Sequence, residues 1–516
     1  MTRERIHHTI YVLGIMLLMA ALPLSHFLMG FSTFLLLLNW VAEWNWREKR
    51  DMLRANRGFL VFSLLFVFLL LGLVHASDPL LTLRRLTAKL VWFFAPIIVA
   101  TTRPLQPRER RQVFASFVFS TFAVGVYSLV YWYRNPVQDV RDISVFIDHI
   151  RFSLCVVMSV VFCVHYCLRE APTTVLKVSA SLLALLLIIY LFLAQTLTGI
   201  LILLAIMFAY GLYLLGSARR TPVRKAVLLS ILSGMVVAFG YVAYLTYDYF
   251  HDQDAVITEQ TTALGNPYTF DPQSMVENGH RIDYYVCKPE LQSAWTQRSD
   301  SALTPWVECT LIRYLNSKGL HKDSAAVMAL SQEDIRNVEN GIANYDYTRV
   351  FGMRRALYPT FFCITLYQKN HYFDNSSLLQ RVELWRVSWL VIRENWLFGV
   401  GLDNVKNALN DQLKKCNSPV VARKKQGCHN QYLTFWLSAG ILFLLYFIFV
   451  LVYPFVRMRN RITFVYVAFA LLMVMSFFME DTLETQTGCI MFAVMNPLLL
   501  MAGGERQNVN RYEYNA

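Results

Sequence analysis

The sequence predicts an all-α polytopic membrane protein with about twelve transmembrane helices and one large, mostly helical loop domain. Two observations lead to this prediction. The 516 residues are 56% hydrophobic and only 16% charged, whereas soluble domains contain about 25% charged residues. The apolar residues also form separate runs of roughly 17 to 25 residues, the length that an α-helix needs to cross a bilayer. Together they exclude a plain soluble enzyme, a secreted disulfide scaffold and a disordered chain.

Charged breaks between the apolar runs define the expected spans. The first run is too long, and too smoothly continued by the second, for a cleaved signal peptide, and no small-residue cleavage site follows it. We therefore expect it to remain in the mature protein. The spans are expected near residues 9–28, 29–45, 58–76, 87–102, 112–133, 151–168, 175–193, 197–216, 224–246, 431–456, 462–479 and 485–503.

Lys and Arg near span ends predict the orientation, because they are retained on the cytoplasmic side. Alternate breaks are rich in these residues, namely Arg47–Arg57, Arg103–Arg111, Arg169–Lys177, Arg219–Lys225 and Arg457–Arg461. The intervening short breaks carry fewer: Arg84, Arg85, Lys89, Arg134, Arg141 and Arg151. Both termini should therefore be cytoplasmic. Much of the net charge of +13 sets orientation, and a nucleic-acid partner is not needed to explain it.

This orientation gives four predicted parts. Residues 1–246 hold helices one to nine, 247–430 form a loop domain outside the cytoplasm, 431–503 hold helices ten to twelve, and 504–516 form a cytoplasmic tail. Within the loop, helical spacing predicts helices over 324–343 and 378–396. The second carries an apolar stripe rich in tryptophan, which suits either the membrane–water interface or packing on the transmembrane bundle.

The loop contains cysteines and acidic residues that could form disulfides or bind a metal. An oxidising compartment permits disulfides, and a Cys416–Cys428 bridge would close a loop just before the tenth span. The absence of Cys-x-x-Cys and His-Glu-x-x-His patterns argues against a structural zinc site. Asp252-Gln253-Asp254 has a spacing that can hold a divalent cation, but its place directly after the ninth span favours a polar helix end. No complete phosphate-binding glycine loop is present.

The strongest candidate for chemistry is the segment 427–433, which leads directly into the tenth span. It places the imidazole of His429, a group that titrates near neutral pH, at the outer mouth of a transmembrane helix. A single interfacial histidine is more often a hydrogen-bonded cap. Here, however, Asn430 follows it, the basic run Arg423-Lys424-Lys425 precedes it, and Arg381 lies upstream on the tryptophan-rich helix.

At these residues the chain resembles the O-antigen ligases, within the superfamily of O-antigen ligases and Wzy-type polymerases. His429-Asn430, nine further residues and Gly440 are similar to the signature His-Asn-x9-Gly of that family. Arg381 to Trp385 resembles its Arg-x3-Trp element, and Gly399-Val400-Gly401 its Gly-Val-Gly element. Glu480-Asp481 after the eleventh span also fits the pattern. The order of these elements and the predicted topology match over essentially the whole chain.

The resemblance implies a glycosyltransferase of the bacterial inner membrane, with its active face in the periplasm. Its donor would be a glycan on undecaprenyl pyrophosphate and its acceptor the core sugar of lipid A, as in lipopolysaccharide biosynthesis. His429 would be the base for the acceptor hydroxyl, and Arg381 would bind the departing diphosphate through its fork of donors. Asn430 would orient the imidazole or the acceptor. The donor is already activated, so no cofactor, nucleotide or metal is demanded.

One departure from the family pattern concerns the eighth span, where the family commonly has an arginine after Thr or Ser. This chain reads Gln195-Thr196-Leu197-Thr198-Gly199 instead. Arg151 is our candidate to replace that cation, against an ordinary arginine at a span end. Arg84 and Arg85 are weaker candidates, and Arg354-Arg355 is expected to be solvated.

Three rival functions remain open. A Wzy-type polymerase would use the same donor but a second lipid-linked glycan as acceptor, and a protein-glycosylating ligase is a further possibility in the same superfamily. A secondary transporter, from a different class, would show inverted repeats and charges at midplane depth. The predicted spans carry few internal charges, and we see no internal repeat.

Overall fold

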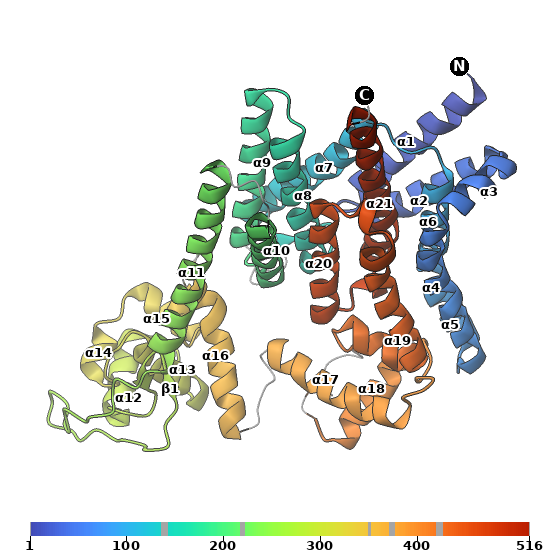
Figure 1. Cartoon of the computed structure of the whole chain (residues 1–516). Helices are drawn as coiled ribbons and strands as arrows, with labels where there is room; N and C mark the ends of the chain where they lie inside the picture. Colours follow the sequence, from blue (N-terminus) through green and yellow to red (C-terminus); the bar gives the residue numbers. More distant parts are fainter. Residues whose placement is uncertain are drawn as a thin grey trace. The chain divides into compact units, whose positions relative to one another are not determined.

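The computed structural model describes residues 2–135, 143–216, 222–348, 352–370, 377–418, 420 and 427–514 (Figure 1). Arg141, Arg219, Arg220 and the run Arg423-Lys424-Lys425 lie outside the described residues. The described chain is mostly helical, which confirms the predicted all-α class. The two strands of the described residues, β1 (Val276–Glu277) and β2 (His280–Arg281), form one short antiparallel pair.

The chain divides into two compact units. The first comprises residues 1–224 and 381–516, and the second comprises residues 225–380. Each unit has its own hydrophobic core. The assignment of residues 247–430 to one loop domain remains a prediction.

The first unit contains nearly all of the long apolar helices. Its elements are α1 (Arg3–Ala21), α2 (His26–Ala42), α3 (Trp46–Ala55), α4 (Leu60–Leu70), α5 (Pro79–Thr87), α6 (Val91–Thr101), α7 (Pro107–Arg134), α8 (His149–Arg169), α9 (Thr174–Leu193), α10 (Leu197–Gly216), α17 (Ser377–Glu394), α18 (Val405–Lys415), α19 (Gln431–Arg457), α20 (Phe464–Met479) and α21 (Gln486–Tyr514). Aromatic rings of three helices meet in its core: Trp92 of α6, Phe435 and Phe447 of α19, and Phe492 of α21.

Seven helices of the described residues are long and apolar enough to span a membrane: α7, α8, α9, α10, α11 (Pro222–Phe250), α19 and α21. This chain is therefore a membrane protein. The sequence runs expected as further spans are shorter or broken in the structure. Helices α2 and α3 meet at a bend of 112°, and α6 has only 11 residues, with Pro96 inside it.

The second unit is built from short helices around a compact core. After α11 come α12 (Lys288–Arg298), α13 (Pro305–Ser317), α14 (Ser324–Met328), α15 (Gln332–Glu339) and α16 (Met353–Asn370). The single helix expected over 324–343 was wrong, because the chain ends α14 at Met328 and starts α15 anew. Ser331 caps α15: its Oγ accepts from Asp334 N at 3.1 Å, and the Asp334 carboxylate accepts from Ser331 N at 3.0 Å.

Helix α17 confirms the helix predicted over 378–396. One face, with Leu384, Val387 and Val391, is buried, and Trp385 packs against Phe478 with ring centroids 5.2 Å apart. The opposite face exposes Val382 and Trp389. The helix therefore packs on the helices of the first unit and presents a second apolar face outward.

The proposed Cys416–Cys428 disulfide was wrong, since the structure records both as free thiols. Cys428 is fully buried, and its sulfur lies 3.0 Å from the Thr434 hydroxyl. Cys416 ends α18, where its sulfur accepts from Gln412 Nε2 at 3.9 Å. Each thiol is thus held by a different partner.

Candidate functional site

A buried carboxylate, Glu480, joins three basic side chains from distant parts of the first unit. His429 Nδ1 lies 3.1 Å from Glu480 Oε2, and Arg151 NH2 lies 3.5 Å from the same oxygen. Arg381 donates to the other oxygen, Oε1. Glu480 itself is only 4% exposed. We call these four residues the His429 cluster.

Four elements bring the cluster together. Arg151 lies in the first turn of α8, Arg381 in the first turns of α17, His429 directly before α19, and Glu480 directly after α20. The structure therefore places three of the predicted site residues around one acidic side chain. Sequence reasoning had noted Glu480 only as part of a motif.

Backbone contacts with Asp481 hold His429 in an unusual conformation. Its φ of 51° lies in the left-handed region, which is costly for a residue with a β-carbon. The Asp481 carboxylate accepts from the backbone N–H of His429 at 3.1 Å and of Asn430 at 3.0 Å. A β-carbon at Gly427 would collide with the same carboxylate. Asp481 thus fixes the turn that presents the imidazole.

Asn430 caps α19. Its side-chain oxygen accepts from Tyr432 N at 3.0 Å and from Leu433 N at 3.2 Å, which satisfies donors that a helix start leaves unpaired. Its Nδ2 donates to the Phe478 carbonyl at 3.2 Å. Both ends of the Asn430 amide therefore have structural partners, and the residue positions the turn at His429.

The Gly-Val-Gly element packs into a break in α19. Gly440 has a φ of 77°, so the helix is interrupted there. The Leu437 carbonyl accepts from Val400 N at 2.6 Å, and Ile441 N donates to the Trp396 carbonyl at 3.0 Å. The loop after α17 thus satisfies the backbone groups that the break sets free. A β-carbon at Gly440 or Gly399 would collide with backbone of the other segment, which explains the glycines.

Arg151 lies beside the place where the family pattern has an arginine. A β-carbon at Gly199, in the first turn of α10, would lie 2.9 Å from the Ser153 β-carbon on α8. The start of α10 and the turn that carries Arg151 are therefore in contact. The Arg151 Nε is buried and lacks a hydrogen-bond partner among the described residues, although Asp148 Oδ1 accepts from its NH1 at 3.0 Å.

The structure does not bring Arg84 and Arg85 into the cluster. Arg85 donates to the Leu402 carbonyl, and Arg84 is exposed on α5. The nearby Lys89, which was not singled out from the sequence, is buried and donates to Glu484 Oε1 at 3.0 Å. Gln431 Nε2 donates to the same oxygen at 3.5 Å. A signal in the sequence was the acidic triplet Glu480, Asp481 and Glu484 between two apolar runs.

The two neighbouring carboxyls have opposite pKa shifts. Burial opposes ionisation of Glu480, but the hydrogen bond from His429 and the charges of His429, Arg151 and Arg381 outweigh it and lower its pKa. Burial and the nearby Glu484 charge raise the pKa of Asp481, despite its hydrogen bond from Thr434. Of the two carboxyls, Glu480 is therefore the one that favours the ionised form, and its negative charge attracts the neighbouring basic side chains.

The remaining candidates have structural partners in the second unit. Asp252 Oδ2 accepts from Arg281 Nε at 2.7 Å, and Asp254 Oδ1 lies 3.1 Å from His280 Nδ1, which agrees with a polar helix end. Arg354 was expected to be solvated, and this was wrong: its NH2 lies 2.9 Å from Asp248 Oδ2. Within the described residues, no group of three or more His, Cys, Asp or Glu has the geometry of a metal site.

The fold and the cluster define a helical membrane protein with a histidine, two arginines and an ionised carboxylate gathered at helix ends. Residues 348–448 match the family model Wzy_C, described as O-antigen ligase. The chain thus carries a domain of the O-antigen ligase family, as its motifs indicated. The match includes Arg381, His429 and Gly440. No curated protein matches the chain.

Proposed function

We propose that this protein is an O-antigen ligase-like glycosyltransferase, which transfers a glycan en bloc from undecaprenyl pyrophosphate to lipid A-core. The observation that supports it best is the convergence of His429, Arg381 and Arg151 on Glu480. Such a reaction needs a base for the acceptor hydroxyl and positive charge for the departing diphosphate, and this cluster offers both kinds of group.

His429 is the proposed base. Its Nδ1 faces the ionised Glu480 at 3.1 Å, so the favoured tautomer carries the proton on Nδ1 and leaves a lone pair on Nε2. The Nε2 atom has no hydrogen-bond partner in the described part of the chain. It accepts the proton of the acceptor hydroxyl as that oxygen attacks the anomeric carbon of the donor.

Arg381 and Arg151 are the proposed diphosphate ligands. When the bond between the anomeric carbon and the phosphate oxygen breaks, the electron pair leaves with the diphosphate. Within the described residues Arg381 donates to Glu480 alone, so most of its donor fork is available, and Arg151 has a buried Nε to offer. Fixed cations at the leaving group lower the barrier, because they need no reorganisation during the reaction.

The proposed topology follows the positive-inside pattern. Twelve membrane crossings, made by long, bent and short helices together, would place both termini in the cytoplasm and residues 247–430 in the periplasm of the bacterial inner membrane. The His429 cluster would then face the periplasm, where lipid-linked glycans meet lipid A-core.

The decisive experiment offers purified protein a lipid-linked glycan with lipid A-core, or the lipid-linked glycan alone. We expect the glycan on lipid A-core and no chain growth on the lipid-linked glycan. Elongation without lipid A-core would instead identify a polymerase, and solute flux without transfer a transporter. We expect full activity in excess EDTA, and its loss, restored by a divalent cation, would show that the reaction needs a metal.

A further inference from the structure

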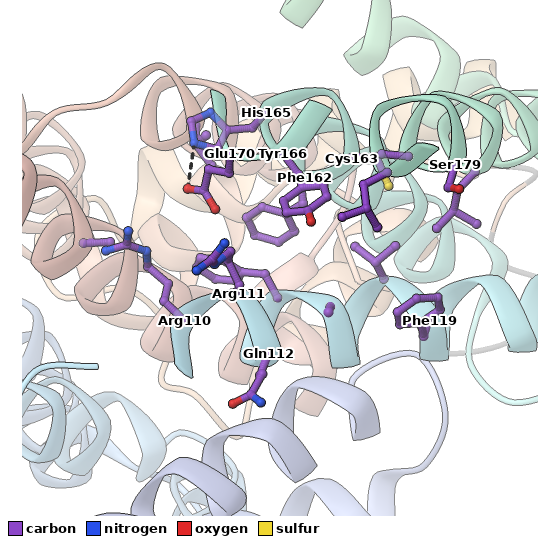
Figure 2. A pocket seen from close by; sticks show the side chains of 18 of the residues that line it. Arg110, Arg111, Gln112, Phe119, Phe162, Cys163, His165, Tyr166, Glu170 and Ser179 are labelled. Atoms are coloured by element: carbon purple, nitrogen blue, oxygen red, sulfur yellow. Dashed lines mark ion pairs between the residues drawn. The ribbon is translucent and has the colours of Figure 1, made fainter. Parts of the chain in front are cut away.

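A large cavity lies at the opposite end of α8 from the His429 cluster. It has a volume of about 670 Å³ and is formed by α7, α8, α9, the start of α20 and the middle of α21 (Figure 2). Arg151 lies near the start of α8, and Glu170, which lines the cavity, directly follows its end. The 19 residue steps from Arg151 to Glu170 correspond to ~28 Å of helix. The end of the cavity at Glu170 is thus separated from the cluster by about the thickness of a bilayer core.

The walls of the cavity are apolar and open sideways. Phe119 of α7 and Leu182 and Leu186 of α9 line it, and each is more than 40% exposed in the chain alone. Phe114 and Phe162 stack at 4.3 Å along another wall. In a membrane, such a sideways opening between helices would be filled by hydrocarbon.

The mouth of the cavity is cationic. Arg108, Arg110 and Arg111, all within the first five residues of α7, line it together with His165 and Glu170. His165 Nε2 and Glu170 Oε1 lie 3.6 Å apart, so the one acidic group among the lining residues has a basic neighbour. Figure 2 shows Arg110 and Arg111 on the same side of the cavity as this pair, while Phe119 and Ser179 lie at the other side. From Arg108 to Phe119, α7 advances ~16 Å.

We propose that this cavity binds an anionic glycerophospholipid of the membrane, with its phosphate at the three arginines and an acyl chain along α7 and α9. Basic pockets between transmembrane helices on the cytoplasmic side bind anionic headgroups in this manner. The arginine fork recognises phosphate oxygens, and the apolar walls receive a chain that would otherwise lie in the bilayer. This site does not depend on the proposed transferase function.

The test measures lipids retained by the purified full-length protein from nanodiscs that contain phosphatidylglycerol and phosphatidylcholine in equal amounts, by native mass spectrometry. We expect phosphatidylglycerol to be retained selectively. R108Q/R111Q should weaken its retention by about 30-fold, since each removed charge contributes ~1 kcal/mol. The matched control R50Q/R54Q removes two exposed arginines of α3 that lie outside the cavity, and should retain the lipid normally.

A second pair of variants tests the apolar part with all arginines present. Ala115→Phe fills the cavity from α7 and should reduce retention, whereas Ala123→Phe, at an exposed position of the same helix outside the cavity, should not. If R108Q/R111Q does not fold, this pair decides. Equal retention of the two lipids by wild type, or equal losses in a variant and its control, would overturn the proposal.

Discussion

Two buried glutamates, one in each unit, have very different surroundings. Glu277 in the second unit is fully buried and accepts both donors of the Arg313 fork at 2.8 Å, with Asn344 Nδ2 at 2.9 Å. Glu480 in the first unit contacts three basic side chains, His429, Arg151 and Arg381, each through one nitrogen atom. Arg313 donates to Glu277 through both Nε and NH2. Arg151 and Arg381 each use only one nitrogen on Glu480, so further N–H groups of both can donate to another molecule. Spare hydrogen-bonding capacity thus distinguishes the candidate site from a structural ion pair.

The largest expected effect is on glycan transfer, and it distinguishes His429 of the first unit from His280 of the second. His429→Ala should lower glycan transfer by ~10²–10⁴-fold, because a positioned general base contributes that much. The control His280→Ala removes an imidazole that also lies 3.1 Å from a carboxylate, Asp254, and should leave transfer near normal. Rates are measured with purified, monodisperse protein. Wild-type transfer by His429→Ala would refute the base assignment.

The next effect concerns stability in the second unit. Glu277→Ala leaves Arg313 buried without its partner, and breaking a buried pair in this way costs ~3–5 kcal/mol. We expect a clearly lower Tm of the purified protein, but normal transfer per folded molecule. A variant that folds like wild type and yet transfers poorly would show that Glu277 serves the reaction.

A smaller effect on glycan transfer is expected to distinguish Arg381 from Arg386, which lies on the same helix, α17. Arg381→Lys should reduce transfer by ~10–100-fold, since a charged hydrogen bond contributes ~1.5–3 kcal/mol and a lysine ammonium cannot replace the fork. The control Arg386→Lys alters an exposed arginine on the same helix, paired with Glu383, and should be nearly silent. Similar activity of the two variants would mean that Arg381 has a structural role.

The smallest effect is a pH dependence of stability. The pKa of Glu480 is lowered in the folded protein, so its stabilising contribution is present above its unfolded pKa and is lost as pH falls through the folded pKa. The Tm difference between wild type and Glu480→Gln should therefore be larger at pH 7 than at pH 3. A difference that grows on acidification would contradict the assigned direction.

Local patterns predicted the parts of the fold that depend on local sequence. The helix expected over 378–396 is α17 (Ser377–Glu394), and the start expected at 431 is the start of α19. Counting apolar residues did not show where a run bends, as between α2 and α3. It also missed the break at Gly440, because that break is stabilised by backbone groups of another segment.

The candidate site was predictable as a set of residues but not as an arrangement. Motif spacing singled out His429 and Arg381, and the absent arginine of the eighth span drew attention to Arg151. That Glu480 would join them depends on contacts between residues more than 50 positions apart in the sequence. Arg84 and Arg85 had the same charge and predicted side of the membrane, yet the chain places Arg85 against a backbone carbonyl instead.

Two backbone hydrogen bonds at the break in α19 join this helix to the loop after α17. The amides of Val400 and Ile441 each donate to a carbonyl of the other segment, so neither segment separates without exposing both to water. In hydrogen exchange, these two amides should become labelled together, as one cooperative unit. These two bonds hold the loop after α17 against α19, and we therefore expect substrates to reach the His429 cluster without separation of the two segments.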